Sequence, residues 1–291
     1  MKRLITHNGV FHADEIMATA ILLKLFPSAE IVRTRDKTII ESADTNADIV
    51  YDVGFGKYDH HQSDKLYRNN GGIPYSSIGL IWRDFGRDVI KKMSSIDIKH
   101  NDIETIFNNI DIKLIRGIDA VDNGINVMGD IEVLNVSKII SAFNPPWDEI
   151  ESENFCFNEA VSFAKIIFDK IMNFELSIIR MKNIIEKAFE DRNPELKSVL
   201  LLPQPGPWQE ALLELDKKEE VLFVVFRNNQ GWMIQAVPKK IGSFESRKLL
   251  PEKWVKEGLP VDDGIFCHQG RFIAGAKSME SIWKLVFEAI K

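Results

Sequence analysis

The chain has 291 residues, of which 45% are hydrophobic and 27% are charged, a balance that is ordinary for a globular protein with one large or two medium domains. Its formal net charge of −6 excludes a general attraction to nucleic acid or to an anionic membrane surface. A polyanionic ligand would therefore have to be held by a local basic patch or by bound cations.

The cysteine content indicates a reducing compartment, and the hydropathy pattern indicates neither a secretory signal nor a membrane segment. Cys156 and Cys267 are too few and too far apart for a disulfide framework or a four-cysteine zinc site. Polar residues interrupt the apolar run that a secretory signal would need near the amino terminus. The longest apolar stretch, Ile16–Phe26, contains Lys24 and is too short to span a bilayer. We therefore expect a soluble, cytoplasmic protein without a membrane segment.

Short strands alternate with helices in the first half of the chain, and this pattern predicts a parallel α/β sheet. Pro27 closes the first helix, and polar residues follow the predicted strands. The expected strands are Lys2–Thr6, Ala29–Arg33 and Ala47–Val53, and the expected helices are Ile16–Phe26, Ser76–Met93 and Asp102–Ile118.

The second half has a different pattern. Phe155–Asp191 is long and has apolar residues at helical spacing, which predicts a helical connector that ends at Asn193-Pro194. Strands separated by turn residues then predict a smaller α+β domain, with a division near residues 190–197. The expected parts are an α/β domain at residues 1–150, the connector at 151–192 and the α+β domain at 193–291. The later elements are strands Val199–Leu202, Val221–Phe226 and Trp232–Val237 and a closing helix Ser278–Ile290.

Four of the six histidines lie at predicted strand ends or in the loops that follow them, namely His7, His12, His60 and His61. In open α/β sheets the ligand crevice lies outside the carboxyl ends of the strands. We therefore expect these loops to meet although they are far apart in sequence.

The first of these loops carries two imidazoles and a carboxylate. Gly9 permits a tight backbone path, and His12 and Asp14 are two residues apart. In an extended loop this spacing turns both side chains to the same side, where they can share a divalent cation. The alternative is that Asp14 only caps the helix that follows, but capping leaves both histidines unexplained.

Two further segments offer ligands. Asp52 ends a hydrophobic strand, where a carboxylate is costly unless it is paired or bound to metal, so it is our candidate for a bridging ligand. In Asp59-His60-His61, one imidazole can bind metal while its neighbour donates to a substrate phosphate, although chance adjacency is the alternative.

A fourth segment has two carboxylates three residues apart at a predicted helix end. Asp119 and Asp122 precede Gly124, and by itself this pattern is typical of a helix cap or turn. Beside the other acidic and histidine clusters, the segment becomes a candidate source of ligands.

These motifs carry a family resemblance. The ordered set His7…His12-x-Asp14, Asp52, Asp59-His60-His61 and Asp122-Asn123-Gly124 resembles the four motifs of the DHH phosphoesterase superfamily. The chain is more similar to the melanocyte-proliferating-gene-one family, also labelled metal-dependent protein hydrolases. That similarity also includes the segments His7–Glu15, Tyr58–Gln62, Asp119–Gly124, Pro207–Glu210, Trp232–Pro238 and His268–Gly275.

The resemblance implies a DHH-type catalytic domain that binds two Mn²⁺-like ions, with Zn²⁺, Fe²⁺ or Mg²⁺ as other occupants, and activates water against phosphorus. His61 would contact the substrate phosphate or the leaving group, and Asp52 and His60 would complete the catalytic set. His12 replaces an aspartate of the superfamily pattern, and the spacing from His7 to Asp14 is one residue longer. The implied metal ligands are His7, His12, Asp14, Asp52, His60 and Asp122, with Asp119 binding directly or as support.

Members of this family are associated with 3′ to 5′ exonuclease action on RNA, so the expected function is exonucleolytic hydrolysis of RNA or short oligonucleotides. The alternatives are a hydrolase of small nucleotides and a non-catalytic, metal-stabilised regulatory protein. A protease function has little support, because the chain contains no His-Glu-x-x-His motif. Ligand types alone do not show turnover, and the oligomeric state is left open.

The superfamily's carboxyl-terminal domain carries a Gly-rich substrate-binding segment, and the resemblance places it here at His268, Arg271 and Gly275. A cation, an imidazole and small residues suit the capture of an anion. The alternative is a plain strand and turn in which Arg271 is solvated and His268 is a surface residue. The residues that would extend this patch along a longer substrate are Lys239, Lys240, Arg247, Lys248 and Lys277.

Overall fold

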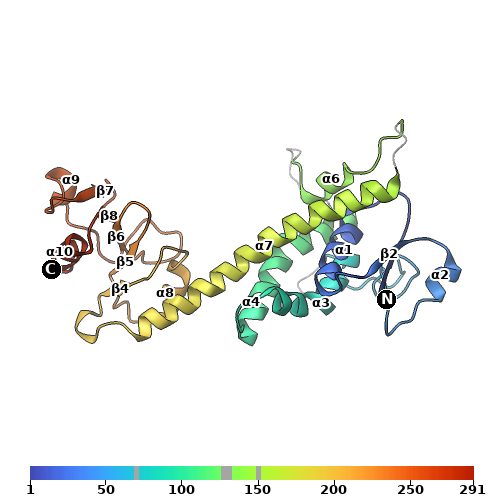
Figure 1. Ribbon diagram of the computed structural model, residues 1–291, viewed down its shortest axis with the longest axis horizontal. Helices are drawn as coiled ribbons and strands as arrows, with labels where there is room; N and C mark the ends of the chain where they lie inside the picture. Colours follow the sequence, from blue (N-terminus) through green and yellow to red (C-terminus); the bar gives the residue numbers. More distant parts are fainter. Residues whose placement is uncertain (69–71, 126–132, 149–151) are drawn as a thin grey trace. The chain divides into compact units, whose positions relative to one another are not determined.

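The computed structural model describes residues 1–68, 72–125, 133–148 and 152–291. The chain divides into two compact units, Met1–Leu176 and Ser177–Lys291, and each is described by itself. Figure 1 traces the elements in chain order.

The first unit is built on three parallel strands in the order β2-β1-β3. These are β1 (Arg3–Thr6), β2 (Glu30–Arg33) and β3 (Ile49–Val50). The predicted α/β class with a parallel sheet is confirmed. The third strand is shorter than expected because Asp52 adopts a left-handed backbone with φ 55°, which a regular strand does not accommodate.

Helices cover this sheet, and α1 is buried from Ala13 to Leu22 without an exposed stripe. A helix that is apolar all round belongs in an interior, and α1 packs along α3 (Figure 1). The short helices α2 and α6 were not predicted from the sequence. The α-helices that lie wholly within the described part of this unit are α1 (Ala13–Leu25), α2 (Lys37–Glu41), α3 (Ser77–Met93), α4 (His100–Ile110), α5 (Arg116–Asp122) and α6 (Val136–Ser141).

The helix expected over Asp102–Ile118 is divided by a π-helical turn, Asp111–Ile115, between α4 and α5. A π turn has more residues per turn than an α-helix, so it rotates the side chains that follow it. The turn therefore contributes to the directions in which Asp119 and Asp122 of α5 point.

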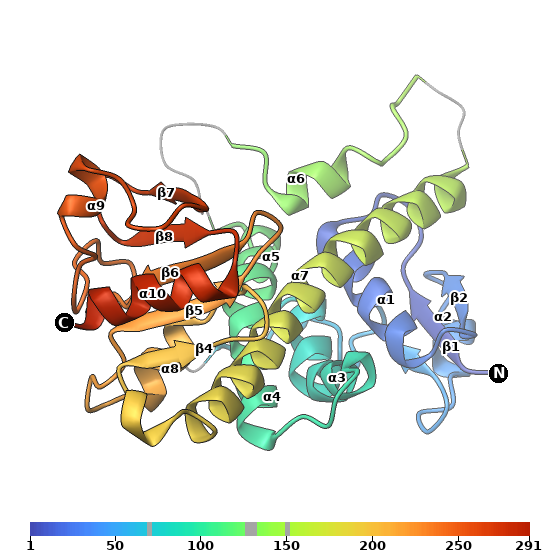
Figure 2. The same cartoon turned by 60° about the vertical axis from the view of Figure 1, so that its left-hand side comes forward.

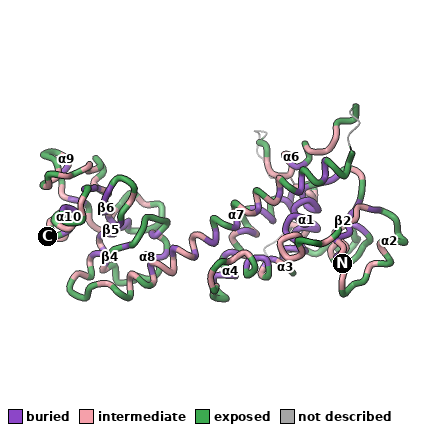
Figure 3. Tube along the Cα trace, viewed as in Figure 1, coloured by how far each residue is buried: buried purple, intermediate pink, exposed green. Residues whose placement is uncertain are grey.

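The expected helical connector is present as α7 (Glu153–Glu190). Buried and exposed positions alternate along it in Figure 3. Near its carboxyl end, Met181 and Ile185 belong to a core cluster of the second unit, which explains why the division between the units falls inside the helix. No helix within the described ranges, α7 included, combines the length and the apolarity needed to cross a membrane.

The second unit contains a mixed sheet in the order β4-β5-β6-β8-β7, in which only the β4–β5 pair is parallel. A 3₁₀ turn, Pro194–Leu196, precedes the first strand. The other elements are β4 (Val199–Leu201), α8 (Gln209–Leu215), β5 (Phe223–Arg227), β6 (Trp232–Ala236), α9 (Lys253–Lys256), β7 (Gly264–Cys267), β8 (Ile273–Ala276) and α10 (Met279–Ile290).

Alternating residues of this sheet form two apolar layers. Phe223 and Val225 pack with Leu285 of α10, which crosses the sheet in Figure 2. Val224 and Phe226 are in the other cluster, with α8 and the end of α7. Burying each such side chain contributes roughly 1.5–3 kcal/mol. The predicted smaller α+β part is therefore confirmed, whereas the exact boundaries 1–150, 151–192 and 193–291 stay a prediction.

Candidate metal centre

Histidine and aspartate side chains meet where the parallel strands of the first unit end. His7 directly follows β1, and Asp52 comes two residues after β3. Because β1 and β3 are parallel neighbours, their carboxyl ends lie at the same edge of the sheet. The structure thus brings these two residues together although they are far apart in sequence.

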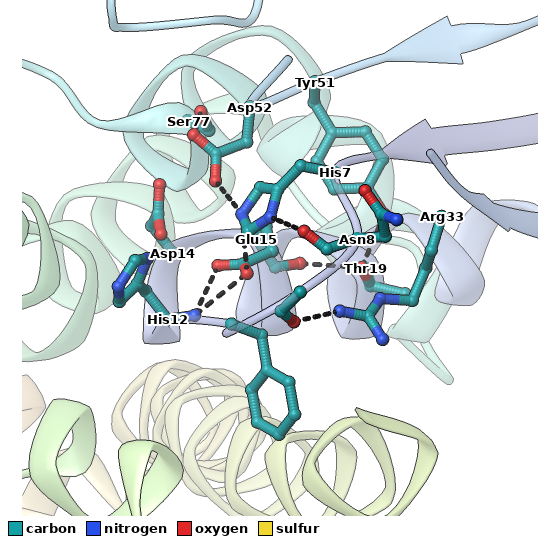
Figure 4. A network of polar contacts seen from close by, with 12 residues as sticks. His7, Asn8, His12, Asp14, Glu15, Thr19, Arg33, Tyr51, Asp52 and Ser77 are labelled. Atoms are coloured by element: carbon teal, nitrogen blue, oxygen red, sulfur yellow. Dashed lines mark hydrogen bonds and ion pairs between the residues drawn. The ribbon is translucent and has the colours of Figure 1, made fainter. Parts of the chain in front are cut away.

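His7 is nearly inaccessible to solvent and lies between two carboxylates, as Figure 4 shows. Its Nε2 atom is 3.0 Å from Oε1 of Glu15 and 3.2 Å from Oδ2 of Asp52. Burial opposes protonation, but the hydrogen bonds with Asp52 and Glu15 outweigh it and raise the pKa of His7 to about 10. The same position would suit a cation in place of the proton.

Asp52 is the central carboxylate of the cluster. Its Oδ1 atom is 3.3 Å from Nε2 of His60 and accepts a 3.0 Å hydrogen bond from Oγ of Ser77. Burial opposes its ionisation, but the hydrogen bonds from His60 and His7 outweigh that effect and hold the pKa of Asp52 below its ordinary value. A non-glycine residue with φ 55° is an uncommon conformation, of the kind that persists where surrounding contacts require it.

His60 approaches three carboxylates through one ring nitrogen. Its Nε2 atom is 3.6 Å from Oδ2 of Asp14, 3.3 Å from Oδ1 of Asp52 and 3.1 Å from Oδ2 of Asp122. Burial lowers the pKa of His60, but the neighbouring carboxylates outweigh burial and raise it. The ring therefore points into the centre of the acidic cluster.

Asp14 is buried, and within the described residues neither of its carboxylate oxygens has a hydrogen-bond partner. Burial and the nearby Asp52 and Asp122 raise its pKa well above the ordinary value. Asp14 does not cap α1, because the N-cap residue is His12, whose backbone N–H donates to the carboxylate of Glu15 at 2.9 and 3.0 Å. A buried acid that accepts no hydrogen bond is costly, and a cation at this position would remove the cost.

The donor atoms of the cluster are close enough to share ions. Histidine nitrogens and carboxylate oxygens suit Mn²⁺, Zn²⁺ or Fe²⁺. In the described ranges no lysine or arginine forms an ion pair with the four cluster carboxylates Asp14, Glu15, Asp52 and Asp122, so divalent cations fit the charge. Donor atoms lie within 4.8 Å of one another in the sets His7–His12–Glu15, Asp52–His60–His61, His12–Asp14–Asp122 and Asp14–Glu15–Asp52.

Two carboxylates with roles at this site were not assigned any role from the sequence. Glu15 is fully buried and contacts His7. Asp59 accepts from Nδ1 of His61 at 2.7 Å and from the backbone N–H of Phe55 at 2.6 Å. The sequence did contain a signal for each residue. Glu15 is an acid beside Asp14 in a mostly apolar helix, and Asp59 directly precedes the histidine pair.

His61 differs from its neighbour, because its side chain is 56% exposed while that of His60 is 10% exposed. Its ring lies 4.2 Å from that of His60, measured between centroids, and its Nδ1 atom is 3.6 Å from Oδ1 of Asp52. The pair therefore offers one imidazole directed into the carboxylates and one open to solvent.

A pocket of about 740 Å³ opens onto the cluster. It is lined by His7, His12, Asp52, His60, His61 and Asp122, and also by cationic side chains that were not singled out in the sequence. Those cations are Arg35, Lys65 and Lys138.

Asp119 lies away from this pocket, and its carboxylate is already occupied. Oδ2 accepts from Nε and Nη2 of Arg68 at 2.9 and 2.6 Å. Oδ1 accepts from the backbone N–H and hydroxyl of Ser76 and from the N–H of Gly79. Gly79 is needed here, because a Cβ would lie 2.3 Å from Oδ2. Of the two acids of α5, the structure brings only Asp122 to the cluster.

We expect Asp119→Asn to destabilise the protein by about 1–3 kcal/mol while the folded fraction keeps its metal, because Arg68 keeps its ion pair with Asp111 but loses its charged partner on α5. Chemical denaturation and elemental analysis of the same samples measure both quantities. Loss of metal without loss of stability would instead make Asp119 a ligand.

The expected substrate-binding residues belong to the second unit. His268 and Arg271 lie in the turn between β7 and β8, where Arg271 has φ 53° and its N–H donates to the carbonyl of His268 at 2.8 Å. Gly275 is buried in β8, and a Cβ there would come within 2.7 Å of Sδ of Met233. The packing against Met233 accounts for this glycine, and a substrate role for the three residues stays a prediction.

The fold and the cluster together define an α/β protein with a candidate metal centre at the carboxyl edge of a parallel sheet. The family described as "Uncharacterised protein family (UPF0160)", whose model is labelled MYG1_exonuc, matches residues 3–290. The chain therefore belongs to this family, and the suspected membership is confirmed.

Named relatives cover nearly the whole chain. The MYG1 protein of Saccharomyces cerevisiae is 32% identical over 98% of this chain and 94% of its own length. The MYG1 exonucleases of Homo sapiens and Mus musculus are each 31% identical over 96% of this chain and cover 83% and 82% of their own lengths.

The chain is also similar to several solved structures, which include the following two. A pGpG-specific phosphodiesterase, PggH from Vibrio, is 13% identical with a TM-score of 0.32, over 99% of this chain and 97% of that one. RecJ from Thermus thermophilus in complex with Mn²⁺ is 12% identical with a TM-score of 0.29, over 99% of this chain and 52% of that one. Both structural similarities are weak.

Proposed function

We propose that this protein is a metal-dependent phosphodiester hydrolase that acts as a 3′ to 5′ exonuclease on RNA or short oligonucleotides. The observation that carries the proposal is the buried carboxylate of Asp14, which accepts no hydrogen bond from the described residues, within a set of histidine and carboxylate donors. Family membership supports it, since the mammalian relatives are named exonucleases. We also propose a cytoplasmic location.

Seven residues would hold two divalent ions, with Mn²⁺ as the first choice, and Asp52 is the proposed bridge because it faces His7 and His60 at once. When bound, such ions activate water and stabilise negative charge on phosphoryl oxygens. The proposed ligands are His7, His12, Asp14, Glu15, Asp52, His60 and Asp122.

His61 is proposed to move a proton at the substrate. Its Nδ1 atom is bound to the buried carboxylate of Asp59, which fixes the ring and directs the second nitrogen elsewhere. Because the side chain is half exposed, Nε2 is available to a phosphate or a leaving oxygen. Asp59 is a positioning residue in this scheme.

The cations of the pocket are proposed to bind the substrate backbone. Arg35 is exposed, and Lys65 donates to Oδ1 of Asn123 at 2.9 Å, next to Asp122. Arginine and lysine at the rim would attract a phosphate, although the whole chain has a net charge of −6.

The test incubates Mn²⁺-loaded protein with end-labelled RNA, end-labelled DNA and dinucleotides, and resolves the products over time. Stepwise shortening of RNA from its 3′ end supports the proposal. Cleavage of dinucleotides alone replaces it with a hydrolase of small nucleotides. A protein that retains metal and cleaves none of the three is a metal-stabilised binding protein, and the proposal fails.

The second unit is proposed to grip the substrate through the turn that contains His268 and Arg271. We expect Arg271→Ala to lower kcat/KM on oligonucleotides by about tenfold, in line with the loss of a charged hydrogen bond, and to leave metal content intact. Arg271→Lys keeps the charge but not the planar fork, so it should recover part of the loss. Steady-state kinetics at sub-saturating substrate measure the effect. Equal activity of wild type and Arg271→Ala would remove this role.

A further inference from the structure

A second pocket, of about 490 Å³, adjoins the candidate metal centre. Both pockets are lined by Arg35, Asp52 and His61, so a ligand can extend from one into the other without leaving the first unit. Its size lies in the range of small-ligand sites. The remaining lining residues are Lys37, Ile40, Glu41, Val53, Gly54, Phe55 and Asp59.

Phe55 is the conspicuous side chain of this pocket, because it is 70% exposed although it is aromatic. The turn that presents it is held in place. Its backbone has φ 55°, and its N–H donates to Oδ2 of Asp59 at 2.6 Å. On the preceding residue, Gly54, a Cβ would lie 2.7 Å from Ile40, so the turn is packed closely against α2. A fixed turn that exposes a ring beside an apolar side chain is suited to stacking a flat ligand.

Polar groups around the ring match the other parts of a nucleotide. Arg35 lies at the junction of the two pockets, where its Nη2 is 3.1 Å from Nδ1 of His7, and Lys37 lines the second pocket. Both can bind phosphate oxygens. Glu41 offers an acceptor for a ribose hydroxyl or a base amino group.

Asp59 connects this pocket to the reaction site. One of its oxygens holds the turn of Phe55, and the other is bound to Nδ1 of His61 at 2.7 Å. A base that stacks on Phe55 would therefore lie one short turn away from the imidazole assigned to the phosphate.

We propose that this second pocket is a nucleoside subsite, in which the base next to the scissile phosphodiester stacks on Phe55 against Ile40 while its phosphate lies at Arg35 and His61. The inference rests on the proposed function, because it takes a nucleotide phosphodiester as the substrate. Stacking on every base alike would give the sequence tolerance that an exonuclease needs.

The test is calorimetric titration of Mn²⁺-loaded, full-length protein with AMP and, separately, with ribose 5-phosphate. The two ligands differ by the base alone, so the ratio of their dissociation constants isolates the contribution of the base. In the wild type we expect AMP to bind about tenfold more tightly, the size that stacking of one base on an aromatic ring produces. In Phe55→Ala most of this preference for AMP should be lost, with the affinity for ribose 5-phosphate unchanged.

Two control variants accompany the test. Phe55→Trp keeps a flat ring and should preserve the ratio. Phe155→Ala removes a 58% exposed phenylalanine of α7 that lines neither pocket and should also preserve it. Equal affinity of the wild type for AMP and ribose 5-phosphate, or an unchanged ratio in Phe55→Ala, overturns the subsite. This readout does not depend on turnover, so failure of the proposed hydrolysis appears separately in the cleavage assay.

Discussion

Asp52→Ala is expected to lose most of its bound metal. Asp52 lies within 3.3 Å of both His7 and His60, so its removal damages both halves of the donor cluster. Removing groups that only support metal ligands typically weakens binding by about 10–100-fold, and loss of a bridging carboxylate should exceed about a hundredfold. Elemental analysis after Mn²⁺ loading and desalting measures the effect.

Two further variants separate charge from backbone conformation. Asp52→Asn keeps the side-chain shape and tolerates the left-handed φ of 55° better than alanine does, so it should fold like the wild type and still lose metal. Asp88→Asn alters an exposed carboxylate of α3 that pairs with Lys91 and lines neither pocket, so it should keep full metal content. If Asp52→Asn and Asp52→Ala both retain wild-type metal, Asp52 is not the bridge.

His61→Ala is expected to keep its metal and to lose phosphodiester hydrolysis by about 10²–10⁴-fold, the size of a general acid–base contribution. The reason is geometric, because the half-exposed His61 ring is bound to Asp59 while the buried His60 ring faces Asp14, Asp52 and Asp122. His60→Ala should therefore lose metal and activity together. Parallel elemental analysis and single-turnover cleavage of labelled RNA separate the two outcomes.

The matched control for this pair is His100→Ala, which removes an exposed histidine at the start of α4 and should change neither quantity. The opposite pattern, in which His61→Ala loses metal and His60→Ala keeps it, would reverse the roles of the two neighbours.

The local pattern of apolar and polar residues was sufficient to predict much of the structure of the first unit. A buried strand followed at once by His7, and a second ending near Asp52, could be recognised from apolar runs that stop at polar residues. Parallel pairing then required their ends to meet, so the convergence of His7 and Asp52 followed from topology. The lengths of β3 and of the helix after Lys99 did not follow, because a left-handed residue and a π turn have no strong sequence signal.

The division of labour between similar side chains could not be seen in the sequence. Asp119 and Asp122 are three residues apart on one helix. Asp119 accepts hydrogen bonds from Arg68 and Ser76, whereas Asp122 faces His60. Glu15 and Asp59 received no role from sequence reasoning, because their contacts with His7 and Phe55 form only in the folded chain.

By itself, the sequence determined the parallel α/β core, the long helix, the mixed α+β part and the family, because strand and helix periodicity and motif spacing are local properties of the chain. Only the tertiary structure decided which acids lack partners, which histidine is exposed and which aromatic ring lines a pocket. The physical reason is that burial, hydrogen bonding and the cost of a buried charge depend on neighbours in space. Among the described residues Asp14 has no hydrogen-bond partner, whereas Asp119 has several, although both are buried aspartates on helices.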